Sequence, residues 1–259
     1  MSASTMSADQ PTQELEIASH VYGVRRADAG RLPTALCGID GTAIRTVVHE
    51  GLAAVVGDVN ADRPRWRGAD LLAYNAVLDV LARAGPIAPV RFGSLMPDDR
   101  SVVEEVLVPG AGRFLALLDR FAGSAQFTLD ASYRGDVALA EIVDADPEVA
   151  ELRARTRELP EGAAYGERLR LGELVAQAID IKRATDAEAL LRGILPFVDE
   201  HEVRLGSGAE HIAGYALLVS DDRRGALEQH LESVAAALHP RVRLQWRGPM
   251  APYDFVGAQ

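Results

Sequence analysis

The chain has 259 residues, of which 48% are apolar and 25% are charged, and this composition is typical of an ordinary folded protein. Its 27 basic and 38 acidic residues leave a net charge of −11, which argues against binding to nucleic acid or to an anionic membrane. Cys37 is the only cysteine, so an intramolecular disulfide and a cysteine zinc site are excluded, as fits a reducing cytoplasm. No apolar run approaches the roughly 20 residues of a membrane span. We therefore expect a cytoplasmic protein of one large or two small domains.

The N-terminal part carries signals for a tail and then three strands. Residues 1–18 are rich in Ser, Thr, Gln and acids and lack the pattern of a signal peptide, so we expect a disordered tail. Residues 20–24 alternate between apolar and small side chains, as a strand does. Two further strand-forming runs, 44–50 and 52–56, meet at a Glu-Gly pair, which predicts a hairpin.

A helix is predicted over residues 69–83, because a Gly-Pro pair follows it and apolar residues recur at helical spacing within it. The predicted buried face consists of Leu71, Tyr74, Leu78 and Leu81. Residues 87–93 are predicted to form a short strand, and the internal Pro89 places it at a sheet edge or at the strand's start.

The following segment predicts two helical pieces and a strand. The Ser-x-x-Glu spacing at 101–104 indicates a helix start, with a break near residues 109–110 and a second piece over 113–121. Residues 125–133 alternate between two faces. The apolar face consists of Phe127, Leu129 and Ala131, and the polar face of Gln126, Thr128 and Asp130. Together these elements predict an N-terminal α/β domain over residues 19–134.

The second half begins with helices. Asp146 has the position of an N-cap, and the proline after it fits the first helical turn. An unusually long helix is expected over residues 164–197. Its predicted buried stripe consists of Leu171, Leu174, Ala178, Ile181, Leu191, Ile194 and Leu195.

The last third predicts a second domain. Strands are expected over 202–205 and 212–219, and an amphipathic helix capped by Asp221 follows. The alternation in 241–246 predicts a final strand. Long helix, two strands, helix and strand make up most of a ferredoxin-like plan. We therefore predict an α+β protein with two domains. They are the α/β domain 19–134 and a modified ferredoxin-like domain 135–247 with long helices, followed by an extended C-terminal tail, 248–259.

The sequence carries no recognisable motif for catalysis, cofactor binding or metal binding. The six histidines show no compact ligand spacing, and Cys37 has no flanking histidine. The two Gly-x-Gly pairs lack the residues of a phosphate loop and are better explained as turns. We predict no catalytic residue, no cofactor and no metal, and hence no enzyme. An enzyme site assembled from scattered residues such as His49, Glu50 and Arg91 stays open as a weaker hypothesis.

Two unusual strings remain. Residues 89–94 read Pro-Val-Arg-Phe-Gly-Ser, which places an Arg and a Phe inside a strand that ends in Gly. Residues 248–256 read Gly-Pro-Met-Ala-Pro-Tyr-Asp-Phe-Val, and the two prolines exclude a helix there. This tail either docks on its own domain or presents its aromatic residues to a partner.

Both strings carry a resemblance to a known family. Together with Val-Tyr-Gly-Val at 21–24, Gly-Leu-Ala-Ala-Val-Val at 51–56 and Asn-Ala-Val-Leu at 75–78, they resemble the GvpF/GvpL family of gas vesicle proteins. The order and spacing match from about residue 19 to 256. The chain departs from the family where Met250-Ala251 replaces a Trp-Pro pair, and where Gln126 and Asp130 replace a Glu and a Lys.

The resemblance implies a non-enzymatic accessory protein of the cytoplasm and the gas vesicle. Family members have two α/β domains and take part in nucleation and assembly by binding the small hydrophobic shell protein and other accessory proteins, and some are minor vesicle components. The family-motif residues expected to bind a partner are Arg91, Phe92, Gly93, Pro249, Pro252, Tyr253 and Phe255. The alternative hypothesis is a ferredoxin-like regulatory module that binds a small molecule.

Overall fold

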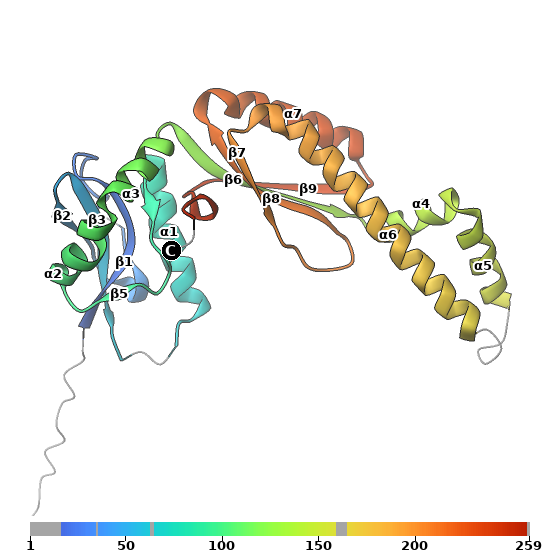
Figure 1. The fold of residues 1–259 in the computed structure, drawn as a ribbon, viewed down its shortest axis with the longest axis horizontal. Coiled ribbons are helices and arrows are strands. Elements are labelled where there is room, and N and C mark those ends of the chain that lie inside the picture. The colour runs from blue at the N-terminus through green and yellow to red at the C-terminus, as the bar shows by residue number, and fades with distance from the viewer. Residues whose placement is uncertain (1–16, 35, 63–64, 159–164, 258–259) are drawn as a thin grey trace, which may run out of the picture. The chain divides into compact units, whose positions relative to one another are not determined.

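A computed structural model of the chain describes residues 17–34, 36–62, 65–158 and 165–257 (Figure 1). The predicted tail 1–18 lies outside the described residues except for its last two, which begin the first strand. The chain divides into two compact units between Arg120 and Phe121, each with a sheet of its own. The division lies before residues 124–133, whereas we expected it after residue 134.

The first unit is built on an antiparallel sheet of five strands. The order is β2-β3-β1-β4, and β5 also pairs with β1. The strands are β1 (Ile17–Arg26), β2 (Ile44–His49), β3 (Leu52–Asn60), β4 (Ala88–Pro89) and β5 (Leu95–Met96). The predicted hairpin joins β2 and β3, and both turn residues, Glu50 and Gly51, have positive φ.

Helices cover both faces of this sheet. They are α1 (Gly68–Ala84), α2 (Asp99–Ser101), the π-helical segment Val102–Leu107 and α3 (Val108–Arg120), and a 3-10 turn spans Ile39–Gly41. Helix α1 packs on one face, and α2 and α3 pack on the other (Figure 1). Strands β1 and β3 are consequently buried along almost their whole length.

Three details of the first unit differ from the sequence-based expectations. Leu71 is exposed, because the buried face of α1 is formed by Tyr74, Val77, Leu78 and Leu81. Only Ala88–Pro89 of the predicted strand 87–93 forms a strand; the Val90 N–H still donates to the Tyr22 carbonyl of β1 at 3.0 Å, and the chain then turns. The helix after it begins earlier, because Asp98 accepts a hydrogen bond from the Ser101 N–H at 2.7 Å and caps α2.

The predicted break near residues 109–110 is also absent. Pro109 is the second residue of α3, and α3 follows the π-helical segment directly. Proline is tolerated there because the backbone hydrogen-bond register changes at the junction between the two helix types.

The second unit contains a four-stranded antiparallel sheet in the order β7-β8-β6-β9. The strands are β6 (Ser124–Tyr133), β7 (Glu200–Arg204), β8 (His211–Ser220) and β9 (Val242–Met250). Helices connect β6 to β7 and β8 to β9, which is the ferredoxin-like plan that the sequence predicts. Strand β6 is central in this sheet, which is why it belongs to the second unit rather than to the first.

The helices of the second unit are α4 (Val137–Ala145), α5 (Pro147–Glu158), α6 (Tyr165–Ile194) and α7 (Asp221–Leu238), with 3-10 turns at Leu195–Phe197 and Tyr253–Phe255. Asp146 accepts hydrogen bonds from the N–H groups of Glu148 and Val149, which confirms its predicted role as a cap. The N-cap of α7 is Ser220 rather than Asp221.

The core of the second unit lies between the sheet and helices α6 and α7. The long helix α6 confirms the prediction for 164–197, and Ile194 of its predicted stripe is fully buried. Ile181 and Leu195 of that stripe are exposed. Much of α6 packs on α4 and α5, which the sequence did not place against it, and Leu195 lies beyond the end of α6 in the 3-10 turn.

Candidate functional site

The Arg-Phe-Gly string forms a tight turn that returns the chain to β1. The N–H and the hydroxyl of Ser94 both donate to the Arg91 carbonyl, at 3.2 and 2.8 Å. Gly93 has φ of +89°, a value that glycine adopts without strain. Its N–H donates to Nε2 of His20 at 3.1 Å, which ties the turn to the middle of β1.

Aromatic rings surround this turn. Phe92 contacts Trp66, Tyr74 and His20 with ring centroids 4.8, 5.3 and 5.9 Å apart. The Tyr74 hydroxyl donates to the Val90 carbonyl, and burial raises the pKa of Tyr74. Phe92 and Gly93 therefore hold the first unit together, and Arg91 is the exposed residue of the string.

The C-terminal string packs on its own unit. Pro249 and Met250 end strand β9, where Met250 is opposite Gln126 of β6. The Gln126 amide donates to the Asp254 carboxylate at 2.5 Å and accepts from the Asp254 N–H at 3.0 Å. Pro252 and Phe255 are buried, whereas Tyr253 is half-buried.

These contacts change the interpretation of Gln126 and Asp130 on β6, the two strand positions at which the chain departs from the family. Both were expected on the polar face of the strand, yet Gln126 is 1% exposed because the C-terminal segment covers it. Asp130 remains more open and pairs with Arg247 of β9 at 3.1 Å. The sequence carries no signal for the first contact, since only the folded sheet shows that Gln126 is buried and therefore needs a polar partner.

Strand β7 is the feature that the sequence did not single out. It is an edge strand, because it pairs with β8 on one side and has no strand on the other side within the described residues. Val203 is 67% exposed and Leu205, just beyond the strand, is fully exposed. An edge with exposed apolar side chains can accept a further strand.

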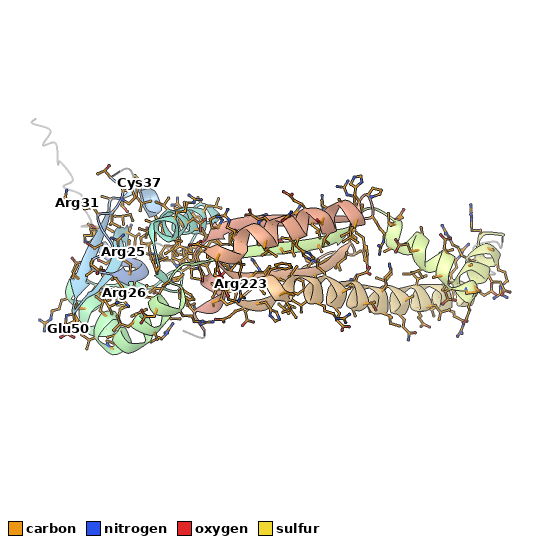
Figure 2. All side chains as sticks on the ribbon, turned by 90° about the horizontal axis from the view of Figure 1, so that it is seen from above. Arg25, Arg26, Arg31, Cys37, Glu50 and Arg223 are labelled. Carbon is orange, nitrogen blue, oxygen red and sulfur yellow. The ribbon has the colours of Figure 1, made fainter. Side chains whose placement is uncertain are left out.

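The structure offers no support for the scattered enzyme site. His49 and Glu50 lie at the β2–β3 turn with 3.9 Å between Nε2 and Oε2, whereas Arg91 belongs to a different turn. In the part of the chain that the structure describes, no cluster of three His, Cys, Asp or Glu side chains could hold a metal. Cys37 is exposed near the 3-10 turn of the first unit (Figure 2). Over the same residues, no helix has the length and apolar character needed to cross a membrane.

Two solved structures that share this fold are crystal structures of gas vesicle proteins. The chain is similar to the crystal structure of GvpF from Anabaena sp. PCC7120, with a TM-score of 0.79 at 18% identity over 93% of this chain and 99% of that one. It is also similar to GvpF from Microcystis aeruginosa, with a TM-score of 0.73 at 17% identity and the same coverage. These likenesses establish the fold, an α+β architecture shared with GvpF.

Sequence comparison establishes the family. The family model described as gas vesicle synthesis protein GvpL/GvpF matches residues 18–257. Gas vesicle protein F of Streptomyces sp. strain CB03234 is 32% identical over 93% of this chain and 100% of its own length, and gas vesicle protein L of that organism is 28% identical over 92% of each. The chain belongs to the GvpL/GvpF family and has a role in gas vesicle formation.

Proposed function

We propose that this protein is a non-enzymatic assembly factor of the cytoplasm that binds the small hydrophobic shell protein, together with other accessory proteins, while gas vesicles form. The observation that carries the proposal is the family match over residues 18–257, which spans both units. The shell protein is apolar and would aggregate before it polymerises, so a soluble partner is needed to shield it.

The edge of β7 supports a way of binding. An extended segment of the shell protein adds to β7 as a fifth strand, and its backbone groups pair with those that β7 leaves open. Its apolar side chains pack on Val203 and Leu205. Glu200 and Glu202 belong to the same short segment, and with the net charge of −11 they keep the complex in solution.

In this proposal, only some of the family-motif residues contact a partner directly, and the others support the local structure. Arg91 is the exposed member, and Pro249 and Tyr253 are half-buried, so a further accessory protein can reach them. Phe92, Gly93, Pro252 and Phe255 support binding by fixing the turn and the C-terminal segment.

Deleting the gene and restoring it tests the proposal. We expect cells without the gene to form no vesicles, or far fewer, by electron microscopy, and a plasmid copy to restore them. A variant with Cys37→Ser should restore vesicles fully, since no chemistry of the thiol is required. Normal vesicle numbers in the deletion strain would contradict the assembly role.

A further inference from the structure

The second unit contains an apolar crevice of about 180 Å³ between the sheet and its two long helices. Helices α6 and α7 lie side by side over the sheet (Figure 2), and small residues along the crevice leave the space between the helices and the sheet unfilled. These small residues are Ala131 on β6 and Ala189 and Gly193 on α6. The remaining apolar walls are formed by Leu190, Ile212, Val234, Leu238, Val242 and Leu244.

One polar atom of the wall has neither a hydrogen bond nor an ion pair to any residue that the structure describes, since Nε of Arg241, which also lacks a hydrogen bond, is ion-paired with Glu141. Nε2 of His230 on α7 is buried and has no hydrogen bond to any residue that the structure describes. The ring is held in place by stacking on Phe197, with centroids 4.9 Å apart. Gly193 faces the same nitrogen, because a Cβ there would lie 3.4 Å from it. A buried nitrogen without a partner is costly, and a ligand that bonds to it removes that cost.

The other polar groups of the crevice are already paired. Asp186 accepts a hydrogen bond from the Tyr133 hydroxyl at 2.6 Å and lies 3.5 Å from Nη2 of Arg241. Arg241 also pairs with Glu141. Nε2 of His230 is therefore the polar atom of the crevice to which a ligand can form a hydrogen bond.

We propose that this crevice binds a small molecule with a single aromatic ring that carries a hydroxyl group, a phenol. The volume fits one ring, since an apolar cavity of about 150 Å³ in another protein holds benzene. A hydroxyl both donates and accepts, so it satisfies Nε2 of His230 in either tautomer of the neutral ring. This inference does not depend on the proposed assembly role.

Binding can be measured by methyl NMR on the full chain with labelled leucine and valine. The probes are p-cresol, which has the ring and the hydroxyl, and toluene, which has the ring alone. We expect both to shift the methyl signals of the crevice residues, and p-cresol to bind about fivefold more tightly, the effect of one net hydrogen bond. Methyl signals that stay unchanged with both probes, or shifts confined to other residues, would overturn the site.

Two variants and a control separate the contribution of the crevice's shape from that of the His230 nitrogen. His230→Phe keeps an aromatic ring beside Phe197 but removes the nitrogen, so p-cresol and toluene should then bind equally well. Val234→Phe fills the crevice and should weaken both at least tenfold, whereas Ala236→Phe on the exposed side of α7 should change neither. Circular dichroism checks that each variant is folded, and a p-cresol preference that survives His230→Phe would overturn the role of His230.

A third probe distinguishes a free ligand from a partner's side chain. N-acetyl-tyrosine amide carries the same phenol on a peptide backbone. We expect it to bind far more weakly than p-cresol, because the volume has no room for the backbone. If N-acetyl-tyrosine amide bound as tightly as p-cresol, the small-molecule assignment would be overturned. The crevice would then be a binding site for a tyrosine side chain of a partner protein.

Discussion

Gly93 shows how one residue holds the first unit in register. Its positive φ closes the Arg91–Ser94 turn, and its N–H reaches His20 in β1. A Cβ at this position would be strained and would lie 3.0 Å from Nε1 of Trp66. The turn thus depends on the absence of a side chain.

Gly93→Ala should therefore destabilise the protein by about 1–3 kcal/mol in urea unfolding monitored by circular dichroism. Gly112→Ala is the matched control, because Gly112 lies in α3 with open space around it. The control should be neutral or should stabilise by about 0.5–1 kcal/mol. Equal stability of the two variants would show that the turn is not constrained as described.

The only lysine has a structural position that its sequence context did not suggest. Lys182 of α6 lies 2.6 Å from Glu141 of α4 and 3.4 Å from Asp186, within a cluster that also contains Arg241, the residue just before β9. The cluster links three parts of the chain that are distant in the sequence. Helical spacing alone brings Lys182 and Asp186 together, whereas Glu141 and Arg241 join them only through the packing of distant parts of the chain, which the sequence does not reveal.

Tyr133 of β6 donates a hydrogen bond to Asp186 of this cluster, and its raised pKa predicts that the stability of the protein depends on pH. Burial, and then the hydrogen bond to Asp186, raise its pKa above the ordinary value of 10. The unfolded chain loses this proton first, so the stability from Tyr133 is complete below pH 10 and is lost as the pH rises toward the folded-state pKa. Tyr133→Phe should unfold about 1 kcal/mol more easily at pH 7 and lose less stability above pH 10.

Tyr165→Phe is the control for this measurement, because Tyr165 is 76% exposed. It should leave both the stability at pH 7 and its decline above pH 10 unchanged. An alkaline decline in Tyr133→Phe as steep as in the unaltered protein would contradict the assignment.

At the scale of elements, local pattern predicted most strands and helices. Alternation located β6, β8 and β9, and helical spacing located α1, α6 and α7. Which strands pair is not a local property, and for this reason β6 was assigned to the first domain and the edge position of β7 was missed. The C-terminal segment was seen as extended, but its hydrogen bonds to Gln126 depend on the sheet being in place.

The contact between Asp254 and Gln126 can be tested by a matched pair of variants. Asp254→Ala leaves the buried Gln126 amide without this acceptor and should cost about 1–3 kcal/mol of stability. Asp254→Asn keeps a side-chain oxygen and should cost clearly less. Hydrogen exchange of the amides of residues 251–257 should speed up in the alanine variant alone. Equal exchange in both variants would show that this contact does not fasten the segment.

For the whole molecule, fold and family follow from the sequence, whereas the candidate site does not. The Arg-Phe-Gly and Gly-Pro-x-x-Pro-Tyr-x-Phe strings, with their spacing, identified the GvpL/GvpF family, and the family match confirms it. Most of the residues in those strings support the fold, and the exposed apolar residues of β7 lie elsewhere in the chain. Motif residues therefore predicted membership better than they predicted the surface that we propose for binding.

Co-purification with the shell protein tests the central claim most directly. The tagged chain, its Val203→Glu/Leu205→Glu double variant and a Val48→Glu control are each co-expressed with the shell protein. Val48 is a suitable control because it is 58% exposed on the edge strand β2 of the first unit. We predict that the unaltered chain and the control retain the shell protein, and that the double variant retains at least tenfold less, since it replaces the apolar contacts that this edge offers with charges. Retention undiminished in the double variant, or absent from the unaltered chain, would contradict the account.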